Sequence, residues 1–217
     1  MMASTEPRRL RADAARNRQA LMDAAERLFA TRGLAVTLDD IAAEAGVNVA
    51  TAYRHFANKH ELLGAFVQRK VDEAVTIAEE AAAIDDPWTG LTEFFTRTLD
   101  LMTGSRGVHD LFAPGFAASE LEKVEDQLQR PLRRMVKRLQ QAGLVRRDIT
   151  PEDLGVLLQM LAAASDIPTT DPAAVVRRYL PVILAGLRPS ETRLPGRPPT
   201  PAQVRAGATA PPRRPAR

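Results

Sequence analysis

The chain has 217 residues, of which 45% are hydrophobic and 26% are charged, and its formal net charge is +3. This composition is ordinary for a globular protein, and the length allows one to two domains. The absence of cysteine excludes disulfides and thiolate metal sites, and three histidines do not favour a histidine zinc site, so we expect no metal and no cofactor. No apolar run reaches the roughly 18 residues that a membrane helix needs. The basic N-terminus lacks the apolar segment of a secretory signal, so we expect a soluble, cytoplasmic protein without membrane contact.

The charge is unevenly distributed along the chain. Residues 1–70 carry a net charge of +3, residues 71–187 a net −6 and residues 188–217 a net +6. An acidic middle argues against the whole body lying on nucleic acid, whereas the basic N-terminal third can meet phosphates. The last stretch contains eight prolines and almost no large apolar residue. We expect residues 1–12 and 188–217 to be disordered, the latter either as a solvated appendage or as an auxiliary DNA-binding arm.

Three helices are predicted after the disordered start. Helical spacing of apolar residues predicts the first helix over about residues 13–31, and Gly33 follows it as a C-terminal cap. Thr37 caps a short second helix, which Gly46 ends. Asn48 then caps a third short helix that runs to about residue 55.

The rest of the chain to about residue 187 also predicts helices, and no segment shows the alternation of a strand. Capping residues, several of them followed by proline, mark the helix starts. These starts are at Asn58, Asp86, Ser119, Thr150 and Asp171. Residues 103–118 predict loops and one short helix. Pro131 should kink or divide its helix, and Pro181 interrupts the last one. The prediction is an all-α protein of about nine helices.

Residues 37–59 predict a helix, a tight turn and a second short helix. Ala42 is small where the two helices cross, and Gly46 permits the positive φ of the turn. At about 100° per residue, Ala52 and Phe56 point together toward the first two helices.

The opposite face of this third helix carries side chains that could contact bases. In a major groove Ala50, Thr51 and Arg54 would touch base edges, while Asn48 and Val49 at the helix tip would enter deepest. Arg54 can contact guanine with two hydrogen bonds, and the Thr51 methyl group can meet thymine. Tyr53 and His55 lie on the flanks, where they would bind phosphates. Two alternatives stay open: Tyr53 packs beneath the fourth helix, or His55 is an ordinary surface residue.

The stretch from Arg16 to Leu63 resembles the DNA-binding domain of the TetR family of bacterial repressors. The matching residues are Ala24-Ala25, Leu28-Phe29, Gly33, Thr37, Ile41-Ala42, Gly46-Val47, Thr51, Tyr53-Arg54-His55-Phe56 and Lys59-His60-Glu61-Leu62-Leu63. The resemblance implies phosphate contacts by Tyr53, His55 and Lys59. It also implies contacts by Thr37 and by a basic residue at the start of the first helix, either Arg16 or Arg18. Ala50 stands where glycine is frequent, which should alter base contacts rather than the fold.

The resemblance implies a helix-turn-helix domain over residues 13–57 and a helical effector-binding and dimerisation domain over residues 58–187. The last two helices, about 151–164 and 172–187, are the expected dimer interface. Their apolar residues are Leu154, Leu157, Leu158, Leu161, Val175, Val176, Tyr179, Ile183 and Leu184. Candidates for the effector pocket, each of which could instead be ordinary core, are Phe94, Phe95, Met102, Phe112, Phe116, Met135 and Met160. Few charged residues fall on the inward faces, which favours an apolar or amphipathic effector.

The resulting hypothesis is a transcriptional repressor that binds a near-palindromic operator as a homodimer and is released by a small molecule. The main alternative is an architectural DNA-binding protein that tolerates many sequences and has no effector. An enzyme is not expected, because the sequence has no Gly-rich phosphate loop, no serine nucleophile elbow, no HExxH motif and no cysteine.

Overall fold

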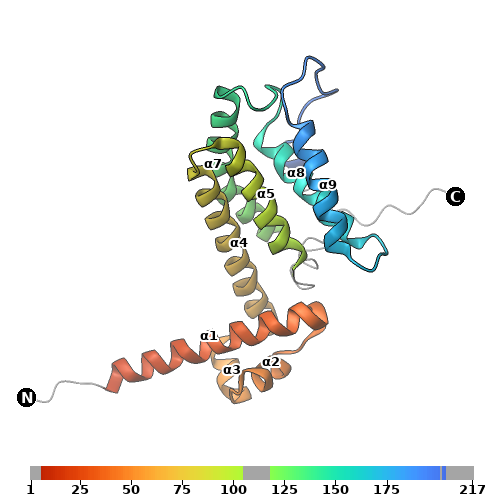
Figure 1. The fold of residues 1–217 in the computed structure, drawn as a ribbon. Coiled ribbons are helices and arrows are strands. Elements are labelled where there is room, and N and C mark those ends of the chain that lie inside the picture. The colour runs from red at the N-terminus through yellow and green to blue at the C-terminus, as the bar shows by residue number, and fades with distance from the viewer. Residues whose placement is uncertain (1–5, 105–117, 201, 204–217) are drawn as a thin grey trace, which may run out of the picture. The chain divides into compact units, whose positions relative to one another are not determined.

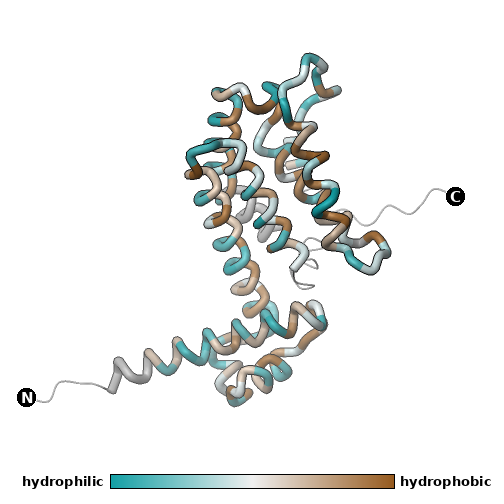
Figure 2. The backbone as a smooth tube through the Cα atoms, in the orientation of Figure 1, coloured by the Kyte–Doolittle hydropathy of each residue, from teal (hydrophilic) through white to brown (hydrophobic). Residues whose placement is uncertain are grey.

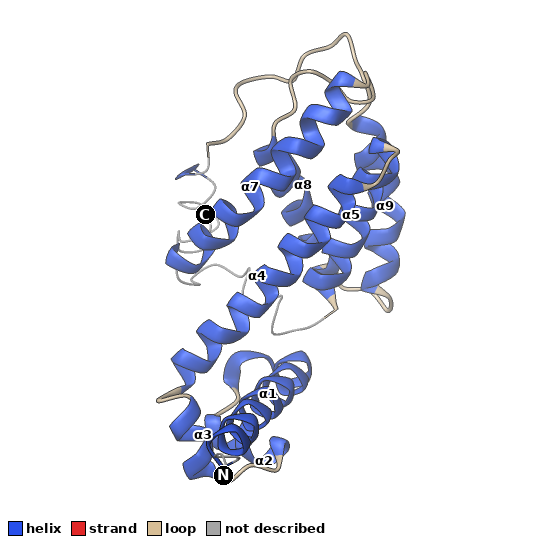
Figure 3. Cartoon of the chain, turned by 90° about the vertical axis from the view of Figure 1, so that its left-hand side faces the viewer, coloured by secondary structure: helices blue, strands red, loops and turns tan. Residues whose placement is uncertain are grey.

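A computed structural model of the chain describes residues 6–104, 118–200 and 202–203. Within these ranges the secondary structure is helical throughout, with no strand (Figure 3), which confirms the predicted all-α class. The described residues divide into two compact units, the first extending to Arg69 and the second beginning at Lys70. This division falls within the fourth helix rather than at its start. In the described part of the chain, no helix combines the length and apolar character needed to cross a membrane.

The first unit contains α1 (Glu6–Arg32), the short 3-10 turn η1 (Gly33–Ala35), α2 (Leu38–Ala45), α3 (Val49–His55) and the beginning of α4 (Lys59–Ala83). Its core is formed by side chains that have lost all contact with solvent. These are Leu21, Ala24, Ala25, Phe29, Ile41, Ala42, Ala52, Phe56, Leu62 and Phe66. The rings of Phe29 and Phe66 meet edge to face with centroids 5.0 Å apart, which joins α1 to the beginning of α4.

Helix α1 begins earlier than the sequence pattern predicted. Residues 6–12 were expected to be disordered, but they form the first turns of α1. Pro7 stands in the first turn of the helix, where its missing N–H costs nothing, and the alanines and arginines that follow are good helix formers. The prediction of disorder was therefore wrong here, because it weighed buried apolar surface and not intrinsic helix propensity.

Local hydrogen bonds fix the turn between α2 and α3. The Asp40 N–H donates to Thr37 Oγ1 (3.1 Å) and the Thr37 N–H donates to Asp40 Oδ2 (2.9 Å), a complete capping box. The Thr37 hydroxyl also donates to Asp40 Oδ2 (2.6 Å), and this bond, followed by the one from the Thr37 N–H, holds the pKa of Asp40 below its usual value. Gly46 ends α2 with φ of 64°, and Asn48 Oδ1 accepts from the Ala50 N–H (2.9 Å) to start α3. The caps predicted at residues 37, 46 and 48 are thus confirmed.

The second unit contains the rest of α4, α5 (Pro87–Thr103), α7 (Ala118–Gln141), α8 (Pro151–Ala163), the 3-10 turn η2 (Ala164–Asp166) and α9 (Pro172–Gly186). Figure 1 labels the α-helices. Hydrophobic and hydrophilic residues recur along these helices (Figure 2), and the hydrophobic ones meet in one core. Three predicted starts, at Asp86, Thr150 and Asp171, are observed with proline in the first turn. The loops and short helix predicted before α7 fall mostly on residues outside the described ranges.

Two prolines lie inside helices without dividing them. Pro131 is within α7 and Pro181 within α9, so of the two outcomes expected for Pro131, a kink or a division, the division does not occur. A proline inside a helix deprives the carbonyl four residues earlier of its usual donor. Those carbonyls belong to Gln127 and Arg177, two exposed residues.

The segment that follows α9 packs on the second unit. The Arg188 guanidinium lies 3.3 Å from the centroid of the Trp88 ring. Arg146 Nη2 donates to the Thr192 carbonyl (2.7 Å), and the Leu194 N–H donates to Asp148 Oδ2 (2.8 Å). The predicted disorder from residue 188 is therefore wrong for residues 188–194, because polar and cation–π contacts order a stretch that has little apolar surface to bury. The predictions for residues 204–217 lie outside the described residues.

Candidate nucleic-acid interface

Helix α3 has one buried face and one exposed face. Ala52 and Phe56 are fully buried, as the helical spacing predicted. Ala50 and Arg54 are exposed and Thr51 is half-buried. Val49 is 41% exposed at the helix tip. A short helix with this distribution presents a small, polar and cationic surface of the kind that reads base edges.

The polar groups of this face are partly oriented by their own helix. Arg54 Nη2 donates to Thr51 Oγ1 (2.7 Å), which holds the guanidinium along the exposed side of α3. A guanidinium has five N–H donors, so the remaining ones are available to a base. Asn48 is exposed and uses its side-chain oxygen as the cap of α3, which leaves its NH₂ group as a donor at the helix tip.

Tyr53 stands on the flank of α3 that faces α2. Its side chain is 48% exposed, so it does not pack beneath α4 as a core residue would. The charge of the Asp39 carboxylate, and then its hydrogen bond, raise the pKa of Tyr53 above the ordinary value. The phenol therefore stays protonated at neutral pH, and its single O–H donor must leave Asp39 before it can donate to a phosphate.

The C-terminal end of α3 is held by a basic residue of α1. Arg18 Nη1 donates to the His55 carbonyl (3.2 Å), and its guanidinium lies 4.3 Å from the centroid of the Phe56 ring. A cation at this end of a helix is favoured by the helix dipole. Arg16, the other basic residue predicted to contact DNA here, forms an ion pair with Asp13 of its own helix. The structure thus brings Arg18, and not Arg16, against α3.

Two further predicted contact residues already have partners in the chain. The Thr37 side chain is engaged in the capping box of α2, and the half-buried Lys59 donates its Nζ to the Leu34 carbonyl. His55 is half-buried at the end of α3. For these residues the roles in DNA binding stay predictions.

Sequence patterns gave no sign of the ion pairs that connect the helices of the first unit. Arg27 Nε lies 2.9 Å from Glu44 Oε1 and connects α1 to α2. Arg69 connects α4 to α1 through Asp23 (2.8 Å) and Glu26 (3.4 Å). The Arg69 guanidinium holds the pKa of Asp23 below its ordinary value. These partners lie 17 to 46 residues apart in sequence, beyond the reach of local spacing rules.

The five described residues that were predicted for an effector pocket separate into two groups. Phe94, Phe95, Met102 and Met135 lie in the core of the second unit, with the two phenylalanine rings 5.8 Å apart. Met160 is 59% exposed on α8, so its assignment to an interior pocket is corrected. Phe112 and Phe116 lie outside the described residues. No group of three metal-binding side chains occurs among the residues that were described.

The prediction for the dimer interface mixed two faces of α8 and α9. Five of its members are buried within the protomer and cannot meet a partner. They are Leu154, Leu158, Leu161, Val176 and Leu184. Leu157, Val175 and Ile183 are half-buried, and Tyr179 is 49% exposed. The outward apolar surface also includes Met160 and Val182, which the prediction had not placed there.

Comparison with known proteins matches both units of the chain. Residues 21–66 match the family described as bacterial regulatory proteins, tetR family. Residues 86–189 match the family described as transcriptional regulator SbtR-like, C-terminal domain. An HTH-type transcriptional regulator of Staphylococcus aureus (strain USA300) is 37% identical over 68 residues. That match covers 31% of this chain and 37% of the relative, so the chain aligns with little more than a third of the length of such curated relatives.

Solved structures match over most of the chain. A TetR transcription regulatory protein from Mycobacterium vanbaalenii is 31% identical with a TM-score of 0.61, and the match covers 82% of this chain and 99% of that protein. A TetR transcriptional regulator from Streptomyces coelicolor is 28% identical with a TM-score of 0.60, and the match covers 80% of this chain and 99% of that protein. The chain therefore belongs to the TetR family of transcriptional regulators and carries its helix-turn-helix DNA-binding domain.

Proposed function

We propose that the protein is a homodimeric repressor that binds a near-palindromic operator through α3 of each protomer and leaves the DNA when a small molecule binds its helical body. The observation that carries the proposal is the exposed face of α3, with Ala50 and Arg54 open to solvent and Arg54 bonded to Thr51. Two such helices would read half-sites about 34–36 Å apart, or a multiple of that distance.

Each polar residue around α3 has an assigned role in this proposal. Arg54, Thr51 and Ala50 contact bases, and Asn48 and Val49 enter the groove at the helix tip. The phosphate contacts come from residues on the flanks and on neighbouring helices. They are Arg16 or Arg18, Thr37, Tyr53, His55 and Lys59. The exposure of Tyr53 on the flank of α3 and the position of Arg18 at the end of α3 support this assignment.

The dimer interface is formed by the outward rows of α8 and α9. We define these rows as Val156, Met160 and Ala163 on α8, and Val175, Tyr179, Val182 and Gly186 on α9. Their spacing of three and four residues places each row on one side of its helix. Met160, Tyr179 and Val182 are at least 49% exposed, and an isolated protomer gains by covering such a surface. Two helices from each protomer would then form a four-helix interface.

The effector site lies against the buried face of α5. Phe94, Phe95 and Met102 of α5 and Met135 of α7 supply apolar contacts, and no charged side chain belongs to the described core. An apolar or amphipathic molecule fits these surroundings. The effector would act by binding one of two dimer arrangements more tightly, and α4, which has residues in both units, is the element that could transmit the difference.

The test is DNA binding by the full chain and by an Arg54→Ala variant. Footprinting on the region upstream of its own gene would identify the operator, and fluorescence anisotropy would measure affinity for single-base variants of it. Loss of the guanidinium should weaken binding by about 1–3 kcal/mol and relax preference at one base pair, because one bidentate contact is removed. Arg130→Ala, which removes an exposed arginine of α7, is the matched control and should bind as the parent does.

Two results would contradict the proposal. An unchanged sequence preference in Arg54→Ala would exclude Arg54 as a base reader. Equal affinity for the operator and for a scrambled duplex in the parent protein, with no response to apolar small molecules, would support the architectural alternative instead.

A further inference from the structure

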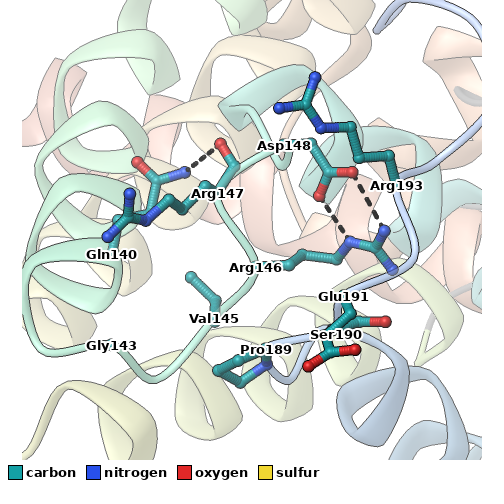
Figure 4. Close-up of a pocket in the computed structure, with 10 residues that line it drawn as sticks. All are labelled: Gln140, Gly143, Val145, Arg146, Arg147, Asp148, Pro189, Ser190, Glu191 and Arg193. Atoms are coloured by element: carbon teal, nitrogen blue, oxygen red, sulfur yellow. Dashed lines mark hydrogen bonds and ion pairs between the residues drawn. The ribbon is translucent and has the colours of Figure 1, made fainter.

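A polar pocket lies at the end of α7, between the loop that leads to α8 and the segment that follows α9 (Figure 4). Its volume is about 640 Å³, within the usual range for small-molecule sites. One wall is formed by Gln140, Gly143, Val145, Arg146, Arg147 and Asp148. The other is formed by Pro189, Ser190, Glu191 and Arg193. None of these residues belongs to the α3 surface, and only Val145 also belongs to the core of the second unit.

The walls of this pocket are held by hydrogen bonds that do not involve a ligand. Arg146 makes a two-pronged ion pair with Asp148, with Nε–Oδ1 at 2.6 Å and Nη2–Oδ2 at 3.0 Å. Its Nη2 also donates to the Thr192 carbonyl, and the Leu194 N–H donates to Asp148. On the opposite side, Gln140 Nε2 donates to the carbonyls of Arg147 (3.3 Å) and Ile149 (3.0 Å). The pocket is therefore preorganised, since a ligand need not order these segments.

Some of the charged side chains that line the pocket are paired with each other, and others have no partner. Arg146 holds the pKa of Asp148 well below its usual range, so this carboxylate is ionised, and both of its oxygens have donors. The pair is therefore neutral as a whole and repels an anion weakly. Arg147 and Arg193 line the same pocket and are exposed, and their guanidinium groups have no hydrogen bond or ion pair with any described residue. The sequence adds to this excess of positive charge, because residues 127–147 contain seven basic residues and no acidic one.

The chemistry of the free groups defines a class of ligand. Guanidinium groups match carboxylate and phosphate oxygens with parallel hydrogen bonds. Glu191, also without a described partner, accepts hydrogen bonds but offers no donor, and it suits a hydroxyl group of the same ligand. Pro189, which is exposed, supplies apolar surface for a short carbon skeleton.

We propose that this pocket binds a small hydroxylated organic anion through Arg147 and Arg193. The site is separate from the apolar effector site of the proposed function, and DNA binding is not needed to detect it. Citrate is the probe, and its binding to the full chain would be followed by calorimetry and by the melting temperature at constant ionic strength. Glycerol is the uncharged comparison, and sodium chloride replaces citrate in the reference samples to remove general screening.

The decisive variant is Arg147→Gln with Arg193→Gln, which keeps hydrogen-bond donors but removes both charges. The proposal expects saturable citrate binding by the parent, binding at least tenfold weaker in this variant, and partial recovery when both residues are lysine. Arg130→Gln, a control outside the pocket, should bind citrate as the parent does. Equal melting temperatures of all variants without citrate would show that folding is intact, as expected for exposed side chains without partners.

Three outcomes would overturn the proposal. The first is a citrate effect no larger than that of chloride at equal ionic strength. The second is undiminished binding in the double glutamine variant, and the third is an equal loss in Arg130→Gln, which would indicate attraction by overall charge. None of these results bears on operator recognition by α3, so the two proposals fail independently.

Discussion

At the scale of single residues, Thr98 is the least expected side chain of α5. Its neighbours Thr92, Thr96 and Thr103 each donate to the carbonyl four residues earlier, at 3.0, 2.9 and 2.8 Å. Thr98 is the buried polar side chain of the described core, and its hydroxyl has no partner among the described residues. It lies between Phe94, Phe95 and Met102 on the face that we assign to the effector. A buried hydroxyl without a partner lowers stability.

Replacing Thr98 by valine tests whether the buried hydroxyl lowers stability. Valine keeps the shape of threonine and removes the hydroxyl, so the free energy of unfolding should rise by about 1 kcal/mol. Urea denaturation of the two proteins would measure the difference. Thr96→Val is the control, because that residue is exposed and its hydroxyl is bonded, and it should give no gain. A clear loss of stability in Thr98→Val would mean that the hydroxyl has a partner after all.

Predictions from local spacing succeeded at the residues whose surroundings are local. The turn and caps around α3, and the burial of Ala52 and Phe56, follow from helix geometry within a dozen residues. Spacing could not predict that Arg18 reaches the His55 carbonyl or that Lys59 reaches the Leu34 carbonyl. Both contacts depend on how helices pack against each other, which a linear pattern does not contain.

At the scale of elements, two residues hold the C-terminal end of α4 against its neighbours. Arg138 of α7 donates to the Ala82 carbonyl, to the Ile84 carbonyl (2.9 Å) and to the Asp85 carbonyl (3.0 Å), so one guanidinium caps the end of α4. On α5, a Cβ added to Gly90 would lie 2.4 Å from the Ala81 carbonyl oxygen. The glycine thus allows α4 and α5 to approach closely.

This close approach makes Gly90→Ala a destabilising change. Alanine is favoured over glycine inside a helix by about 1 kcal/mol, but here the backbone of α4 or α5 must shift to admit the methyl group. We expect a net loss of about 1–3 kcal/mol in the free energy of unfolding, the usual cost of overpacking, measured by urea denaturation. Gly64→Ala in α4 is the control, because its Cβ would meet nothing within 4 Å and the change should stabilise by about 0.5–1 kcal/mol. Equal effects at both positions would mean that helix propensity, not contact, governs residue 90.

Helix starts were predictable because their signals are contained in the sequence around them. The cap and proline at Asp86 and at Asp171 fall where the helices begin. The segment after α9 was not predictable in this way. Its order depends on Trp88, Arg146 and Asp148, which are at least 40 residues away in sequence and carry no local turn signal.

At the scale of the whole molecule, α8 and α9 are apolar on two sides. This explains why the residues predicted for the dimer interface include both buried and outward-facing ones. One side, with Leu158 and Leu184, joins the core of the protomer. The other side carries the outward rows, with Met160 and Val182 at 59% and 63% exposure. A helix that is apolar on two sides has no single stripe in its sequence, so spacing could not tell the side that is buried in the protomer from the side left for a partner.

The outward rows lead to a prediction about assembly. Val182→Asp places a charge at the most exposed apolar residue of α9, and burying it in an interface without a partner would cost several kcal/mol for each of the two copies. The parent should have twice the 23.7 kDa mass of one chain in analytical ultracentrifugation, and the variant should have the mass of one chain at micromolar concentration. Arg134→Asp, which alters an exposed residue of α7, should stay dimeric, and circular dichroism should show the same helicity in all three proteins.

Because the core side of α9 is untouched, a folded Val182→Asp variant that still forms the parent's dimer would exclude the outward rows as the interface. If it is monomeric, it should also lose the tight binding to a two-half-site operator while keeping weak binding to a single half-site, since each α3 would then act alone.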